Sequence, residues 1–185
     1  MKCIRCPKCN KIIVGDKIDL TATRTPCPEC GDVGSVRELW PRIDILSLTD
    51  DVDLSSLDDE QALPIKAILY VSVFDFLFED FLSQLLLKMG MTPIMVEVCM
   101  ESTDSFSDRL GLFRKITGQK FKDFEERKGF KEFGKKFREL KEQRNNFVHK
   151  TFSHNFSSLT EHFEIVERGM LPLFVALNND FLATS

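Results

Sequence analysis

Two pairs of cysteines near the start of the chain have the spacing of a metal site. Cys6-Pro7-Lys8-Cys9-Asn10 and Cys27-Pro28-Glu29-Cys30-Gly31 are two copies of one short turn. Asn and Gly tolerate the left-handed backbone conformation, which favours them after the second thiol of each turn. Two such turns can supply the four thiolates of a tetrahedral zinc site, and the residues between them suit a hairpin. We therefore predict a zinc ribbon in which Cys6, Cys9, Cys27 and Cys30 hold one structural zinc ion.

Cys3 is a further thiol close to this set, because two residues also separate it from Cys6. The proline and the asparagine accompany Cys6 and Cys9, so these two are the predicted ligands and Cys3 is a spare thiol. A redox role is the weaker alternative for the pairs. Zinc ribbons can be structural or can bind nucleic acid or partners, and the sequence leaves these uses open. A local net charge of 6 − 3 = +3 mildly favours phosphate contact; it comes from Lys2, Arg5, Lys8, Lys11, Lys17 and Arg24 against Asp16, Asp19 and Glu29.

A second group of polar residues lies in the string Arg144-Asn145-Asn146-Phe147-Val148-His149, near the end of an expected helix over 130–150. The helical phase of the apolar stripe places Arg144 inside the stripe. A buried Arg needs an anion or a strong acceptor. Asn145 and His149 are four residues apart and share the adjoining face. The stripe consists of Phe130, Phe133, Phe137 and Leu140.

A counter-charge for Arg144 is available in an expected helix over 61–89. Ser72, Asp75, Glu79 and Ser83 follow one another at intervals of 3, 4 and 4 residues and share one face. If the two helices pack antiparallel, Asp75 or Glu79 can hold Arg144. The alternative is that both carboxylates face solvent, since carboxylates are rarely buried without a partner.

The string Arg-Asn-x-x-x-His on the penultimate long helix of a small helical bundle resembles HEPN domains, which carry an Arg-x4–6-His motif. The resemblance covers roughly residues 60–180. It implies a dimer that pairs the two motif helices across a two-fold axis. It also implies a metal-independent endoribonuclease of a toxin–antitoxin, phage-defence or CRISPR-associated system, with an antitoxin or regulatory protein as a possible partner. Other HEPN domains have lost catalysis, so a non-catalytic dimeric module that binds RNA or protein is the alternative.

The chemistry of the motif agrees with RNA cleavage. A metal-independent reaction needs a base for the 2′-hydroxyl, an acid for the leaving oxygen and cations on the phosphate. His149 from each of two protomers can supply the base and the acid, Arg144 can clamp the phosphate, and Asn145 can orient a ligand or the His. By analogy, the expected products carry a 2′,3′-cyclic phosphate and a 5′-hydroxyl. We expect the other histidines, His154 and His162, to be ordinary surface residues.

The charge distribution favours RNA as a ligand. Residues 109–150 hold 14 Lys and Arg against 6 Asp and Glu, a net charge of +8. Basic residues with interleaved aromatics can bind a single strand by phosphate contact and stacking. The alternative is a solvated helix face over a Phe core. The aromatic residues concerned are Phe106, Phe113, Phe121, Phe124 and Phe130.

These residues must be positioned by a mainly α fold, a HEPN-like helical bundle preceded by a small β zinc ribbon. We expect the ribbon over 1–40, with a hairpin over 12–20 and a short strand within 33–40. An acidic linker with a net charge of −6 follows over 41–60, and an all-α domain over 61–185. Its further helices are expected after Thr92-Pro93, over 105–117 and from Ser158, where Glu161 suits a capping box and Pro172 predicts a kink or a split.

Composition limits the setting of the chain. The whole chain has a net charge of 25 − 29 = −4, which excludes a uniformly basic coat for nucleic acid. No apolar run is long enough for a membrane span, and no apolar signal region opens the sequence, so we expect a cytosolic protein. The long helix is apolar around most of its circumference, which exceeds the need of one bundle. We therefore predict a homodimer.

Overall fold

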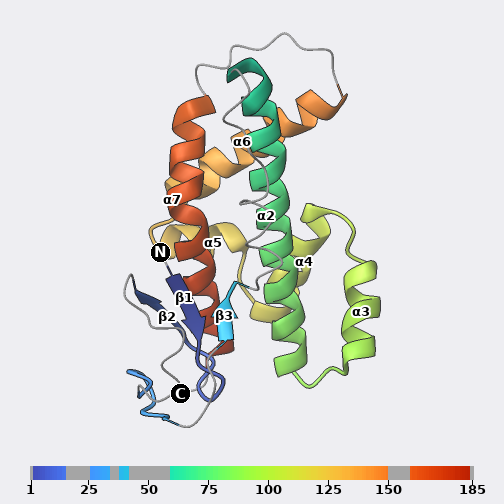
Figure 1. Cartoon of the computed structure of the whole chain (residues 1–185). Helices are drawn as coiled ribbons and strands as arrows, with labels where there is room; N and C mark the ends of the chain where they lie inside the picture. The colour runs from blue at the N-terminus through green and yellow to red at the C-terminus, as the bar shows by residue number, and fades with distance from the viewer. Residues whose placement is uncertain (1, 16–25, 34–37, 42–58, 150–158, 184–185) are drawn as a thin grey trace.

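The computed structural model describes residues 2–15, 26–33, 38–41, 59–149 and 159–183. These residues form a helical bundle preceded by a small antiparallel sheet, which confirms the mainly α fold class (Figure 1). No helix in these ranges is both long enough and apolar enough to cross a membrane. Of the expected acidic linker, residues 42–58 lie outside the described part, and its last two residues already belong to the first described helix.

The N-terminal sheet has three strands in the order β2-β1-β3, with β1 (Lys2–Arg5) antiparallel to both neighbours. β2 (Ile12–Gly15) begins where the hairpin over 12–20 is expected, but its partner is β1, which precedes the first cysteine turn. That turn is therefore the connection between two paired strands. β3 (Glu38–Trp40) is the short strand expected within 33–40. Residues 16–25 of the expected hairpin lie outside the described ranges.

The helices lie close to where the apolar periodicity predicts them, with one addition. The segment after Gly118 contains a short helix that its dense charge conceals in the sequence. Of the two expectations for Pro172, a kink or a split, the split does not occur, because the last α-helix continues through this residue and passes directly into a π-helix. Ser158 and its capping box lie outside the described residues. The helices are α2 (Asp59–Lys88), α3 (Pro93–Glu101), α4 (Phe106–Thr117), α5 (Phe121–Arg127), α6 (Lys131–His149), α7 (Leu159–Leu177) and the π-helix η2 (Asn178–Leu182).

Two helix ends follow local rules that the sequence displays. The Thr92 side chain accepts a hydrogen bond from the backbone N–H of Met95 and caps α3, and Pro93 occupies the first helical position. Helix α4 ends at Gly118, which adopts a left-handed φ of 74° that favours glycine. Both ends confirm the predictions from the sequence.

The core of the bundle is a cluster of phenylalanine rings around Phe74 of α2. The Phe74 ring lies 4.0 Å from the Phe137 ring and 6.2 Å from the Phe133 ring, centroid to centroid. Two successive turns of α6 therefore meet one turn of α2, and Figure 1 shows α6 crossing α2 instead of lying antiparallel beside it. Helix α7 packs against both helices.

The five aromatic residues of the basic segment belong to this core. Phe113, Phe121 and Phe124 are buried, while Phe106 and Phe130 are half-buried against the same cluster. Stacking of RNA bases on the three buried rings is therefore wrong as an interpretation, and for these rings the alternative of a Phe core is confirmed. The basic side chains around them remain largely exposed.

Two helical glycines provide a test of how tightly α6 and α7 pack. A Cβ on Gly169 of α7 would lie 2.5 Å from Cδ2 of the buried Phe133 ring, whereas a Cβ on Gly111 of α4 would meet nothing within 4 Å. We expect Gly169→Ala to lower the free energy of unfolding by about 1–2 kcal/mol, because overpacking outweighs the gain in helix propensity. Gly111→Ala should raise it by about 0.5–1 kcal/mol. Urea unfolding of both variants checks this, and a stabilised Gly169→Ala protein would show that the α6–α7 contact is loose.

Candidate functional site

The four predicted cysteine ligands converge on one point in the N-terminal part of the chain, which we call the ribbon. The sulfur atoms of Cys6, Cys9, Cys27 and Cys30 all lie within 4.8 Å of one another, and the cysteines of the chain are free thiols. Across the cluster, Cys6 lies 3.8 Å from Cys30 and Cys9 lies 3.9 Å from Cys27, sulfur to sulfur. Four clustered sulfur ligands are positioned to hold a metal ion.

The two turns that carry the thiols have the same backbone geometry. The N–H of Asn10 donates to the carbonyl of Cys6 at 2.7 Å, and the N–H of Gly31 donates to the carbonyl of Cys27 at 2.8 Å. Asn10 has a φ of 56° and Gly31 a φ of 70°, the left-handed conformation that these two residue types tolerate. Each turn thus points its two sulfurs to the same side.

The thiols of the cluster differ in acidity. Burial raises the pKa of Cys9 to about 12. Burial also opposes ionisation of Cys27, but hydrogen bonds from the backbone N–H groups of Glu29 and Cys30 lower its pKa to about 7. Cysteines ligate metals as thiolates, so a metal ion held by this cluster would take the place of the thiol protons.

Cys3 lies outside this cluster. Its side chain packs in the apolar core with Ile12 and Trp40, and burial raises its pKa. Cys3 thus packs with the core of the bundle, whereas Cys6, Cys9 and Cys27 form a separate buried cluster, so Cys3 takes no part in the thiol site although its spacing to Cys6 would permit it.

The π-helix η2 fastens the first cysteine turn to the bundle. Nδ2 of Asn178 donates to the backbone carbonyl of Asn10 at 2.7 Å, and Oδ1 of Asn179 accepts from the N–H of Ile12 at 3.0 Å. The side chain of Asn10 returns a hydrogen bond to the carbonyl of Leu182 at 3.2 Å. Asn178 is almost fully buried. The ribbon and the bundle are therefore joined by polar contacts to main-chain atoms as well as by the shared apolar core.

The second candidate site lies where α6 crosses α2. Arg144 is half-buried, and its Nη2 atom lies 3.9 Å from Oδ2 of Asp75, so the inward phase expected for Arg144 agrees with the structure. The other oxygen of Asp75 is buried and has no hydrogen-bond partner among the described residues. Burial raises the pKa of Asp75, although Lys141, Arg109 and Arg144 all oppose this rise.

The second carboxylate of the α2 stripe has a different partner. Glu79 pairs with Arg109 of α4, whose Nη2 lies 2.8 Å from Oε2. Lys141 of α6 lies over the Phe106 ring, with Nζ 3.5 Å from its centroid, and burial lowers the pKa of this lysine. Three cations thus face two carboxylates at this crossing. No local pattern in the sequence identifies Arg109 or Lys141, because both come close to Asp75 only through the fold.

The remaining motif residues lie toward the end of α6. Asn145 is exposed, one position after Arg144. Helix α6 ends at His149, whose side chain lies outside the described part of the structure, as does His154. The expectation that His162 is a surface residue is wrong: it is buried, and its Nε2 lies 2.7 Å from Oε2 of Glu139. The partner on α6 explains how this histidine is accommodated inside the bundle.

Comparison of the chain with protein-family models, with curated proteins and with solved structures finds no match. The interpretation of both sites therefore depends on the geometry of the thiol cluster and of the helix crossing.

The thiol cluster leads to a prediction about metal content. Cys27→Ser should abolish stoichiometric metal binding, because one of four converging ligands is lost. Cys3→Ala should retain the metal, since Cys3 packs in the apolar core. Elemental analysis of the two purified variants and the parent protein checks this. The assignment would be contradicted if the Cys3→Ala protein contained no metal, or if the parent protein itself contained no metal.

The buried carboxyl at the crossing leads to a prediction about pH. The pKa of Asp75 is higher in the folded protein than in the unfolded chain. The contribution of this carboxyl to the free energy of unfolding is therefore fully present at pH values below its unfolded pKa of about 3.9. That contribution is lost as the pH rises through the folded pKa, because the buried group must then ionise. Asp75→Asn cannot ionise. Its free energy of unfolding, relative to the parent protein, should rise between pH 4 and neutral pH in urea titrations. A constant or falling difference would show that Asp75 ionises easily in the fold.

Proposed function

We propose that the chain is a metal-independent endoribonuclease of the HEPN type that acts as a homodimer, with a structural zinc ion in its ribbon. The observation that carries the proposal is the position of Arg144, turned inward from α6 and opposed by Asp75 at the crossing with α2. A guanidinium in this position is costly unless an anion compensates it, and the attack on RNA requires a cation at the phosphate.

The charge balance at the crossing supports an anionic ligand. Arg109 is engaged by Glu79 at 2.8 Å, whereas Arg144 approaches Asp75 only to 3.9 Å, longer than a hydrogen bond. The guanidinium group of Arg144 therefore has N–H donors available for a phosphate, which guanidinium groups bind in a bidentate manner. The surplus of cations over carboxylates at the crossing favours the same ligand.

His149 is the proton-transfer residue of the proposal. It follows Arg144 by five residues in α6, and the resemblance to HEPN domains pairs two such motifs across a two-fold axis. One His149 would then remove the proton of the 2′-hydroxyl while the other protonates the 5′-oxygen that leaves. The 2′-oxygen forms a bond to phosphorus as the bond to the 5′-oxygen breaks, which gives a 2′,3′-cyclic phosphate and a 5′-hydroxyl. Asn145, exposed beside Arg144, is available to orient the RNA or the histidine.

The surface next to the crossing supports a dimer. Phe76 is 48% exposed directly after Asp75 in α2, Ile68 of the same helix is 42% exposed, and Val148 of α6 is 54% exposed. Exposed apolar side chains on both helices of the crossing are available for contact with a second subunit. A dimer through this surface would bring two α6 helices, and with them two copies of the motif, close together.

Zinc is the metal that fits the ribbon best. Four sulfur ligands without an open position suit a structural tetrahedral zinc site. Bound there, zinc supplies folding energy to the ribbon, and the proposed reaction at α6 takes no step through it.

The function is tested by comparing the parent protein with His149→Ala on one single-stranded RNA. Both proteins are purified identically to exclude contaminating nuclease. We expect the variant to lose cleavage by about 10²–10⁴-fold, because one proton-transfer group is removed, while light scattering still reports a dimer. Cleavage by the parent should persist in EDTA as long as the ribbon keeps its zinc.

Three results would count against the proposal. Equal cleavage by both proteins would exclude His149 as the proton-transfer group. A parent protein that is monomeric at micromolar concentration would remove the composite site. Cleavage by neither protein on a broad RNA panel would replace catalysis with a non-catalytic binding role.

A further inference from the structure

Helix α3 carries a large exposed apolar surface. Ile94 is 73% exposed, Val98 61% and Met95 53%. The opposite side of the helix, with the buried Val96 and Met100, packs on α2, and Figure 1 shows α3 standing at the edge of the bundle. Met89, at the end of α2, extends the surface with 62% exposure. Nothing within the described residues covers this side of the helix.

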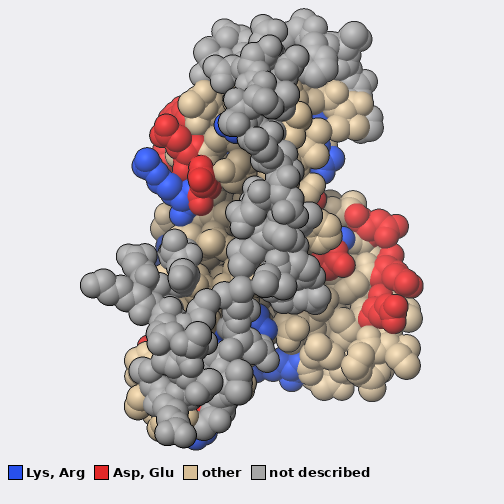
Figure 2. Space-filling model, viewed as in Figure 1, with Lys and Arg blue, Asp and Glu red and all other residues tan. Residues whose placement is uncertain are grey.

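One edge of this apolar surface is acidic. Glu97 and Glu101 lie one turn apart on α3 and flank the stripe of Ile94 and Val98. Figure 2 shows acidic side chains gathered over α3 on this face of the molecule. No ion pair engages Glu97, Glu101 or Asp104 among the residues that the structure describes, so their charges are available to a ligand.

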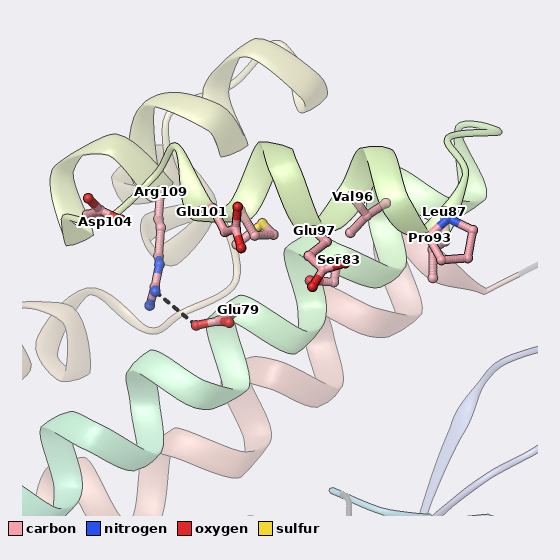
Figure 3. A pocket seen from close by; sticks show the side chains of 10 residues that line it. Glu79, Ser83, Leu87, Pro93, Val96, Glu97, Glu101, Asp104 and Arg109 are labelled. Carbon is pink, nitrogen blue, oxygen red and sulfur yellow. Dashed lines mark ion pairs between the residues drawn. The ribbon is translucent and has the colours of Figure 1, made fainter.

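A cavity of about 450 Å³ lies between α3 and α2 along the acidic edge. Figure 3 shows Glu97 and Glu101 pointing into it from α3, opposite Glu79 of α2. Arg109 also lines the cavity, but its charge is paired with Glu79. The cavity is therefore acidic, and its walls include Leu87, Pro93 and Val96 as apolar contacts.

We propose that the α3 surface, defined by Ile94, Met95, Val98, Glu97 and Glu101, docks a basic amphipathic helix of a partner protein. The apolar stripe would receive the apolar face of that helix, and the acidic edge would receive its Lys or Arg side chains. Methionine side chains at the surface adapt their shape to such ligands. Helix α3 has nine residues and spans about 14 Å at about 1.5 Å per residue, so two to three turns of a partner would cover it.

The acidic charge of the α3 surface favours a basic helix over a second copy of the chain, a nucleic acid or an anionic membrane. A second copy that docked through the same surface would place Glu97 and Glu101 against their own equivalents, and like charges across an interface disfavour association. Nucleic acid and anionic membranes are repelled by the same carboxylates. The proposal is independent of RNA cleavage, because its residues lie on α3 and the proposed catalytic residues lie on α6.

The test uses the full-length protein and a defined peptide probe. The probe is a 14-residue Leu/Lys peptide with amphipathic helical spacing. A peptide of the same composition in scrambled order and a Leu/Glu peptide of the same spacing serve as controls. Fluorescence anisotropy measures affinity, and ¹H–¹⁵N NMR locates the binding surface. We expect saturable one-to-one binding of the amphipathic Leu/Lys peptide, weaker at high salt, with chemical-shift changes confined to α3 and the adjoining end of α2.

Variants separate the apolar and the charged contributions. Val98→Glu should weaken binding at least tenfold, and so should Glu97→Lys combined with Glu101→Lys. Val14→Glu changes an exposed valine of the ribbon, and Glu132→Lys changes an exposed acid of α6; both should bind the probe as the parent does. Circular dichroism confirms that each variant is folded, and a variant that is unfolded is replaced by Ile94→Glu.

Four results would overturn the proposal: no binding of the Leu/Lys peptide, equal binding of the scrambled or the Leu/Glu peptide, shift changes centred away from α3, or unchanged affinity in a folded Val98→Glu protein. Loss of self-association in Val98→Glu would assign the surface to a second copy and would also refute a separate partner. Unchanged RNA cleavage in this variant is expected, so a failure here is distinguishable from a failure of the proposed nuclease.

Discussion

The packing of aromatic rings around Phe74 is the constraint on which the rest of the structure depends. This ring has no exposure to solvent and touches rings from α4, α5, α6 and α7. Edge and stacked contacts between rings fix orientation as well as distance. Because α6 crosses α2 at this residue, the direction of α6 and the place where its polar residues emerge are set by the core. Asp75 follows Phe74 in the chain, so the same turn of α2 supplies both the centre of the core and the acceptor for Arg144.

The residues of the polar site are therefore positioned by closely packed helices and not by a flexible loop. Side chains at the edge of a rigid aromatic core have few alternative rotamers. Lys141 illustrates this, since its ammonium group lies over the Phe106 ring and burial lowers its pKa. The carboxylate of Asp75 remains incompletely satisfied in this setting, and an incompletely satisfied polar group next to several cations is a common property of sites that bind a ligand.

Structural features that depend on residues close together in the sequence were predictable from the sequence. Features that depend on contacts between distant elements were not. The thiol cluster follows from two short turns that each carry their own signature, and the inward phase of Arg144 follows from periodicity within one helix. Strand β1 escaped prediction because it is short and contains a cysteine and an arginine. The burial of His162 depends on Glu139 from another helix. The division of Asp75 and Glu79 between Arg144 and Arg109 depends on three helices meeting, which no local pattern contains.

The asparagine contacts of η2 have a consequence for how this chain can diverge. Asn178 and Asn179 bind main-chain atoms of Asn10 and Ile12, so these two contacts do not depend on the side chains of the cysteine turn, and the Asn10 side chain adds a bond of its own, to Leu182. A joint made in this way constrains the path of the ribbon backbone but leaves the outer side chains of the ribbon free to change. Mutations on that outer face could accumulate without loosening the attachment to the bundle. Surface specificity in the ribbon could then drift over evolutionary time while the geometry of the whole molecule is inherited unchanged.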